Sequence, residues 1–127
     1  MAKRSILFVC LGNICRSPLA EGVFRQVLVE RGMADEFAID SAGMGDWHLG
    51  QAPDPRAIAI ARANGVDISG QRARGIRPED FGRFDLILGM DRKNIRELNE
   101  IAPGASRDKN KLFLDYAGSE AKEVPDP

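Results

Sequence analysis

The feature that most constrains the fold of this chain is a short apolar run that leads directly into a turn and then a helix. Residues 5–10 (SILFVC) combine Ile, Leu, Phe and Val in the way typical of a strand buried on both faces. A turn containing glycine follows, and Ser17-Pro18 marks a helix start, with Ser17 as the cap and Pro18 in the first helical position. The helix is expected to end at Gly32. This order of strand, tight loop and helix is typical of an α/β domain.

The same alternation of apolar runs and helical segments continues along the chain. The further expected elements are a strand over 37–41, a helix from the cap Asp54 to Asn64, a short helix over 78–81, a strand over 85–90, a helix from the cap Asp91 to Pro103 and a strand over 111–114. Because parallel strands need helical crossovers, the pattern predicts an α/β three-layer sandwich. We expect a central four-stranded parallel sheet in the order 2-1-3-4, with helices on both faces, in one domain spanning residues 1–127.

Composition argues against several classes of protein. Lys and Arg number 18 against 19 Asp and Glu, and the net charge of -1 offers no excess that would favour nucleic acid or a membrane surface. No apolar run approaches the roughly 20 residues that span a bilayer, so we expect a cytoplasmic protein without a signal peptide. The two cysteines lie close together and His48 is the single histidine, so we expect thiol chemistry and no structural zinc site.

The predicted sheet order places a ligand site at the loop that begins at Cys10. The order reverses at the first strand, and ligands in such sheets bind beyond the carboxyl ends of the strands at the reversal. Loop N–H groups and a helix N-terminus can surround a phosphate, Arg16 can hold two of its oxygens, and the same field stabilises a Cys10 thiolate as a nucleophile. The residues of this phosphate-binding loop (P-loop) are Leu11, Gly12, Asn13, Ile14, Cys15, Arg16 and Ser17, whose hydroxyl could donate to the thiolate. In the alternative interpretation, Cys10 is an inert buried residue and Ser17 only a cap.

The residues around this loop form a motif of high specificity. Residues 9–18 read VCLGNICRSP and match in full the pattern V-C-x-G-N-x-C-R-S-P. On this motif the chain resembles the low-molecular-weight protein tyrosine phosphatases, as a bacterial-type member. The similarity continues through Ser41-Ala42-Gly43, Trp47-His48, Asp54-Pro55-Arg56 and Met90-Asp91-Arg92. The resemblance implies a hydrolase that removes phosphate from phosphotyrosine-bearing proteins through a phosphocysteine intermediate, without a cofactor.

The resemblance also implies roles for individual residues. Cys10 attacks phosphorus and Arg16 holds the equatorial oxygens, while Asp126, which precedes Pro127, matches the family's general acid and protonates the leaving phenol. Asp54 is the rival acid by sequence, but it fits better as a helix cap. Asp126 could alternatively be a solvated residue of the tail.

A long loop follows the second strand, and its length points to a functional role. Residues 42–53 (AGMGDWHLGQAP) show no apolar periodicity, and a loop of about a dozen residues in so small a domain is usually functional. By resemblance, Trp47 and Met44 are expected to wall the substrate pocket. Trp47 could instead be a partly buried anchor of the loop.

Three more positions match residues that support the family's site. Asn13 and Ser41 resemble the pair that holds the phosphate loop, although either could be an ordinary turn residue or strand terminus. Cys15 could form a reversible disulfide with Cys10 and make the site redox-sensitive, or it could be a small buried filler.

The sequence is also compatible with two other functions, and it departs from the family at its C-terminal end. An arsenate reductase on the same scaffold ordinarily needs a downstream resolving thiol, and no cysteine follows Cys15. A phosphate- or phosphotyrosine-binding module with weak or no turnover is favoured by the end of the chain at Asp126-Pro127, where the C-terminal helix of the family is absent. An apolar face left by that helix should lower stability or invite weak self-association of a monomer.

Overall fold

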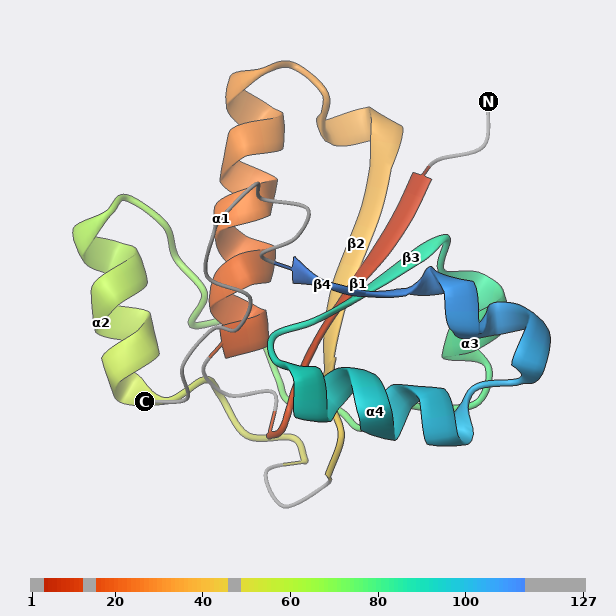
Figure 1. Ribbon diagram of the computed structural model, residues 1–127. Helices are drawn as coiled ribbons and strands as arrows, with labels where there is room; N and C mark the ends of the chain where they lie inside the picture. Colours follow the sequence, from red (N-terminus) through yellow and green to blue (C-terminus); the bar gives the residue numbers. More distant parts are fainter. Residues whose placement is uncertain (1–3, 13–15, 46–48, 114–127) are drawn as a thin grey trace.

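Among the described residues, four parallel strands form one sheet (Figure 1). The computed structural model describes residues 4–12, 16–45 and 49–113. The strands are β1 (Arg4–Cys10), β2 (Phe37–Gly43), β3 (Leu86–Gly89) and β4 (Asn110–Leu112). They lie in the order β2-β1-β3-β4, and each neighbouring pair is parallel. The predicted order 2-1-3-4 is therefore confirmed, with its reversal at β1.

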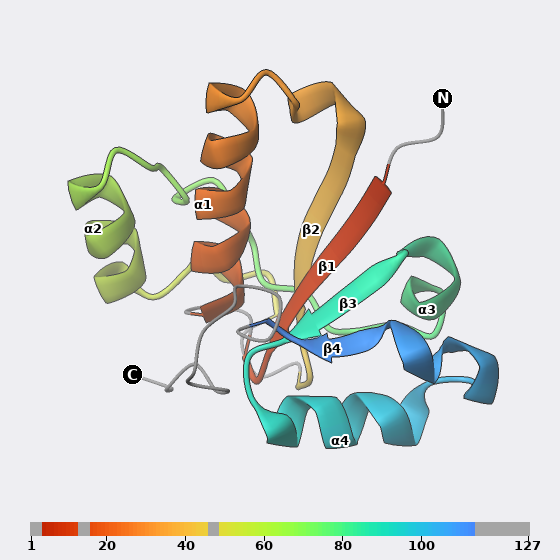
Figure 2. The same ribbon diagram turned by 45° about the horizontal axis from the view of Figure 1, so that its top comes forward.

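Helices cover both faces of this sheet, as Figures 1 and 2 show. They are α1 (Arg16–Glu30), α2 (Pro55–Ala63), α3 (Asp80–Arg83) and α4 (Arg92–Ile101), together with the 3-10 helices η1 (Ala34–Glu36) and η2 (Gly104–Lys109). α1 packs on one face and carries α2 on its outer side, whereas α3 and α4 lie on the other face. The predicted three-layer α/β sandwich is confirmed.

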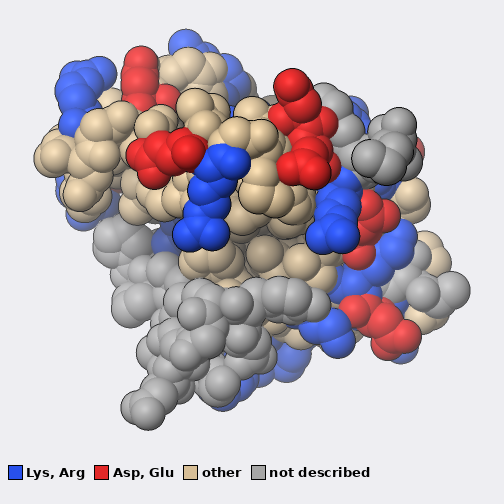
Figure 3. Space-filling model, turned by 90° about the horizontal axis from the view of Figure 1, so that it is seen from above, with Lys and Arg blue, Asp and Glu red and all other residues tan. Residues whose placement is uncertain are grey.

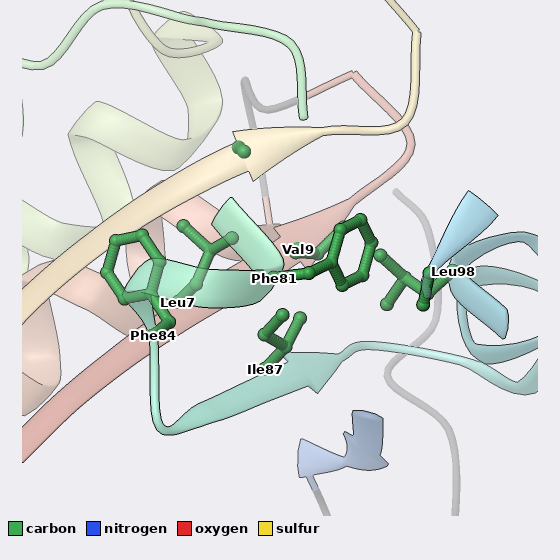
Figure 4. Packing of buried hydrophobic residues seen from close by; sticks show 8 residues of the cluster. Leu7, Val9, Phe81, Phe84, Ile87 and Leu98 are labelled. Carbon is green, nitrogen blue, oxygen red and sulfur yellow. The ribbon is translucent and has the colours of Figure 1, made fainter. Parts of the chain in front are cut away.

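Alternation along β1 divides the core between the two faces. Leu7 and Val9 point toward α3 and α4 (Figure 4) and are completely buried. Phe8 and Cys10 point the other way, under α1, where the rings of Phe8 and Phe24 meet edge to face at 5.8 Å. Successive side chains of a strand face opposite ways, so this continuous apolar run reflects burial on both faces. The same alternation directs the Cys10 thiol toward α1.

α2 packs on α1, and a glycine permits the close approach of the segment that follows α2. Ala57 and Ala61 of α2 form a small core with Val66 and Ile68. A Cβ at Gly22 of α1 would come within 2.4 Å of Ile68 Cγ2. A glycine inside a helix is ordinarily unfavourable, and here it makes room for the neighbouring segment.

Two helix starts differ from the predicted ones. α1 begins at Arg16, so the prediction that Ser17 caps this helix is wrong; Ser17 is its second residue and is completely buried. The short helix predicted over 78–81 lies at Asp80–Arg83. It is displaced because an Asp80 carboxylate oxygen accepts the Arg77 N–H at 2.8 Å and thereby closes the turn that precedes the helix.

The remaining differences are small. β2 runs to Gly43, two residues beyond the predicted end, because it pairs with β1 as far as Cys10. β4 begins at Asn110, and Leu114, its predicted last residue, lies outside the described residues. η1 and η2 are too short to leave a periodic apolar pattern, so no sequence signal predicts them.

Basic and acidic side chains lie beside one another on the face shown in Figure 3. This mixture reflects the near balance of 18 basic and 19 acidic residues in the sequence. Across the three described ranges, the structure contains no helix with the length and apolar character needed to cross a membrane.

Candidate active site

The Cys10 thiol lies where β1 ends and α1 begins. Cys10 is only 3% exposed, and its Sγ lies 3.0 Å from the hydroxyl oxygen of Ser17 in a buried contact. The contact joins the last residue of the strand to the first turn of the helix, so the thiol faces the positive end of the helix dipole. The hydroxyl that was expected to cap the helix therefore contacts the sulfur.

Arg16 is the first residue of α1, and a carboxylate holds its guanidinium. Arg16 is 6% exposed, and its Nη1 donates to Asp91 Oδ2 at 2.8 Å. The other oxygen of Asp91 accepts the Asn94 N–H at 2.8 Å, while the Asn94 side chain accepts the Asp91 N–H, and together they form a capping box at the start of α4. One carboxylate thus fixes both a helix terminus and the arginine.

The charge of Arg16 also influences the ionisation of Asp91. Burial by itself raises the pKa of the Asp91 carboxyl. Hydrogen bonds from the Arg16 guanidinium and from the Asn94 and Lys93 N–H groups, with the positive charge of Arg16, outweigh burial and hold this pKa below its ordinary 3.8. The carboxylate is therefore ionised over the whole physiological pH range.

This pKa shift predicts how stability depends on pH. Because the pKa of Asp91 is lower in the folded protein, its charge stabilises the fold above pH 3.8, and this contribution is lost as pH falls through the depressed folded pKa. Asn can still cap α4, so Asp91→Asn is expected to lower the free energy of unfolding by about 1 kcal/mol near neutral pH. Urea titrations of both proteins should show this difference shrinking in acid. A difference that persists below the folded pKa would contradict the assignment to charge.

Asp91 was predicted only as a helix cap, and its contact with Arg16 went unpredicted. A signal for that contact was present, because Asp91 follows β3 and Cys10 ends β1, and these strands are parallel neighbours. The carboxyl ends of neighbouring parallel strands meet at one edge of a sheet, so residues that follow them lie close together.

The loop after β2 is hydrogen-bonded to the start of the phosphate-binding loop. The Met44 N–H donates to the Cys10 carbonyl oxygen at 2.9 Å, and the Gly45 N–H donates to that of Leu11 at 3.0 Å. Leu11 and Gly12 are partly buried. The Met44 side chain packs on the core beside α4 and, together with Ile101, lines a surface hollow there. Its predicted place in the wall of the substrate pocket stays a prediction.

Ser41 lies inside β2 and is not the strand terminus, and its predicted support of the phosphate-binding loop stays a prediction, whereas Asp54 caps a helix. Ser41 is 5% exposed on β2, opposite Phe8 of β1, close to the carboxyl end of the sheet. Asp54 caps α2, because its carboxylate accepts the Arg56 N–H at 2.8 Å. The cap prediction for Asp54 is confirmed.

The other predicted site residues cannot be placed in this geometry. Asn13, Ile14 and Cys15 of the loop, Trp47 of the pocket wall, and Asp126 lie outside the described residues. Their roles remain predictions.

The described geometry around Cys10 favours negative charge. The Cys10 sulfur and the Ser17 hydroxyl lie in contact at the N-terminus of α1, where backbone N–H groups and the helix dipole favour negative charge, and Arg16 is the first residue of that helix. Within the described ranges, no group of three or more His, Cys, Asp or Glu residues is arranged to hold a metal ion. Fold and site together define an α/β protein with a buried thiol beside the N-terminus of a helix.

Comparison with known proteins identifies the family. Residues 5–127 match the family described as low molecular weight phosphotyrosine protein phosphatase, and the chain belongs to this family. It is 50% identical to the pig (Sus scrofa) enzyme of that name over 96 residues, which are 76% of this chain and 60% of the pig protein. It is 42% identical to the low molecular weight protein-tyrosine-phosphatase YfkJ of Bacillus subtilis over 124 residues, which are 97% of this chain and 80% of YfkJ.

Solved structures agree with this assignment. The crystal structure of YfkJ superimposes with a TM-score of 0.95 at 41% identity, and the match covers 100% of this chain and 80% of that one. Vibrio vulnificus Wzb in complex with benzylphosphonate gives a TM-score of 0.85 at 33% identity, over 99% of this chain and 82% of Wzb. The match to the pig protein spans less than two thirds of its length.

Proposed function

We propose that this chain is a protein tyrosine phosphatase that hydrolyses phosphotyrosine and other aryl phosphate monoesters through a phosphocysteine intermediate. The observation that carries the proposal is the buried 3.0 Å contact between Cys10 Sγ and Ser17 Oγ at the start of α1. A helix N-terminus favours both a thiolate and a bound phosphate. The description of the family and the benzylphosphonate bound to Wzb support the same class of ligand.

In the first step, the phosphoryl group is transferred from the phenol to sulfur. The Cys10 thiolate attacks phosphorus, so that an S–P bond forms while the P–O bond to the phenol breaks. Asp126, in its protonated form, gives its proton to the departing phenolic oxygen. The Arg16 guanidinium binds two equatorial oxygens, and its pairing with Asp91 holds it in place for this task.

In the second step, water releases the phosphate from sulfur. Water attacks phosphorus, the Asp126 carboxylate takes a proton from that water, and the S–P bond breaks to give inorganic phosphate and the Cys10 thiolate. A hydrogen bond donated by the Ser17 hydroxyl stabilises the sulfur as its negative charge returns. Neither step changes an oxidation state, so the reaction needs no oxidant or reductant.

A steady-state assay tests this proposal. With a metal chelator present, the chain is expected to hydrolyse an aryl phosphate such as p-nitrophenyl phosphate, and phosphate-like oxyanions are expected to inhibit it competitively. Calorimetric titration with inorganic phosphate distinguishes an enzyme from the second candidate, a phosphate-binding module with weak or no turnover. A chain that binds phosphate but does not turn over the ester would refute the enzymatic proposal in favour of a binding module.

The assignment of the general acid makes a separate prediction. Asp126→Asn should slow the hydrolysis of an aryl phosphate with a poor leaving group by about 10²-fold or more, because such a phenolate needs a proton as it departs. A good leaving group such as p-nitrophenolate should be affected less. Equal rates for the two proteins with the poor leaving group would show that Asp126 is not the acid.

The proposal extends to partners and regulation. The substrate is a phosphotyrosine-bearing protein, and the cytoplasm suits this chemistry because thiols stay reduced there. A two-electron oxidant such as a peroxide, itself reduced to water or an alcohol, would convert the Cys10 and Cys15 thiols to a reversible disulfide, which would switch off the nucleophile and protect it from further oxidation.

A further inference from the structure

One extended segment, residues 73–76, holds both ends of the loop that follows β2. At the near end, the Gly43 N–H donates to the Arg74 carbonyl oxygen at 2.8 Å and the Ile76 N–H donates to that of Gly43 at 2.9 Å. At the far end, the Gly50 N–H donates to the Ala73 carbonyl oxygen, and the Ala73 N–H donates to that of Gln51, each at 2.8 Å. We call residues 73–76 the clamp segment.

The clamped loop lies directly beside the phosphate-binding loop. On one side, Gly43 forms a parallel bridge with Gly75 of the clamp segment. On its other side, Gly43 pairs with Cys10 of β1. The next two residues, Met44 and Gly45, donate to the carbonyl oxygens of Cys10 and Leu11. Gly43 is therefore the single residue between the clamp segment and Cys10, and a displacement of the clamp segment would shift the backbone next to the phosphate-binding loop.

Arg74 attaches the clamp segment to the body of the fold. Its Nη1 and Nη2 donate to the two carboxylate oxygens of Asp80 at 3.0 and 3.1 Å, and its Nε donates to Asp40 on β2 at 3.1 Å. Asp80 is 3% exposed at the start of α3. Burial lowers the pKa of Arg74, but the carboxylates of Asp80 and Asp40 outweigh this effect and raise it. Three elements, β2, α3 and the clamp segment, thus meet on one guanidinium.

We propose that Arg74 is a positioning residue for the candidate active site, and that it sets the affinity for the organic group of a phosphate monoester by holding the loop at residues 44–51. This inference rests on the proposed function. In the proposed function the P-loop and Arg16 bind the phosphate, whereas Met44 and Trp47, the expected wall of the substrate pocket, fall within residues 44–51 by sequence. A displaced loop therefore weakens contacts with the rest of the substrate and leaves phosphate binding intact. The planar fork of Arg74 hydrogen-bonds to two carboxylates at once, whereas a lysine offers one compact charge and is expected to keep only part of these contacts.

Kinetics of Arg74→Lys test the proposal against a merely structural role. We expect KM for an aryl phosphate to rise about 5-fold or more, with kcat and the inhibition constant of inorganic phosphate changing less than about twofold. Arg72→Lys is the matched control, because the Arg72 guanidinium donates to the carbonyl oxygens of Ser69 and Gln71 and is exposed. This control should leave KM unchanged.

Tryptophan fluorescence provides a readout that does not depend on activity. The single tryptophan, Trp47, falls within the clamped loop by sequence, so acrylamide quenching reports on that loop alone. Arg74→Lys is expected to raise the quenching constant about twofold at temperatures where the protein is folded, whereas Arg72→Lys is not. Should Arg74→Lys fail to fold, Asp40→Asn weakens the same cluster from a side chain that is 40% exposed, and the same change is expected on a smaller scale.

The outcomes separate this inference from the proposed function. Unchanged quenching in the folded variants would overturn the positioning role, whatever the activity of the chain. A fall in kcat with KM unchanged would overturn it as well. If the wild-type chain binds phosphate but hydrolyses nothing, the proposed function fails, and the quenching experiment still decides whether Arg74 holds the loop.

Discussion

Replacing Cys10 with serine is expected to lower kcat for an aryl phosphate by about 10⁴-fold or more, because a neutral serine hydroxyl is a much weaker nucleophile than a thiolate. The substitution barely changes volume, and the serine can still hydrogen-bond to Ser17. Phosphate affinity is therefore expected to change by less than about threefold, because Arg16 and the loop N–H groups are untouched. Discontinuous rate assays measure kcat, and isothermal titration calorimetry with inorganic phosphate measures the phosphate affinity.

The other cysteine offers a control for this experiment. Cys15→Ser also removes one thiol from the same loop, and it is expected to keep at least about a tenth of the activity, since the proposed chemistry uses Cys15 only in oxidation. Turnover that survives in Cys10→Ser would rule out a phosphocysteine intermediate. Loss of activity in both variants together with loss of phosphate binding would point to a damaged loop.

Substituting Arg16 with lysine is expected to lower kcat/KM by about 10³-fold, because a lysine cannot bind two phosphate oxygens with a planar fork. The effect should appear in phosphate affinity as well as in kcat. Arg16 is almost completely buried and is held by Asp91, so a lysine ammonium would be drawn toward the carboxylate and away from the phosphate. Steady-state kinetics and phosphate titration again provide the measurements.

The same substitution elsewhere on α1 serves as the comparison. Arg25 pairs with Glu21 one turn away, and its side chain is 55% exposed. Arg25→Lys is expected to leave kcat/KM within about twofold of wild type. A loss in Arg25→Lys comparable to that in Arg16→Lys would show that the helix, and not the guanidinium at its start, accounts for the effect.

Local pattern was sufficient to predict the architecture of this domain. Short apolar runs, capping residues and prolines mark elements whose hydrogen bonds lie within a few residues, so the strand ending at Cys10 and the cap at Asp54 were both confirmed. The order of the sheet followed from the rule that parallel strands are joined by helical crossovers. The contact between the Cys10 sulfur and the Ser17 hydroxyl could be expected for the same reason, because the two residues are only seven positions apart.

Of the two predictions for Ser17, the approach of its hydroxyl to the Cys10 sulfur agrees with the structure, whereas its role as the helix cap was wrong. Serine before proline is a good helix cap, but here the helix starts at Arg16 and the serine hydroxyl lies 3.0 Å from the Cys10 sulfur. Propensity describes what a side chain does with its own backbone, and it carries no information about a strand that ends under the helix.

The sequence by itself determined the layers, the sheet order and the loop in which chemistry is possible. Only the tertiary structure decided how that loop is held, because the groups concerned are distant in sequence: Arg16 and Asp91 are 75 residues apart, and Arg74 and Asp40 are 34 apart. The first pair meets because parallel strands bring their carboxyl ends to one edge of the sheet, and both pairs form because a guanidinium that is largely buried needs carboxylate partners. Periodicity and capping signals extend over a few residues, and so they could not show which partners those would be.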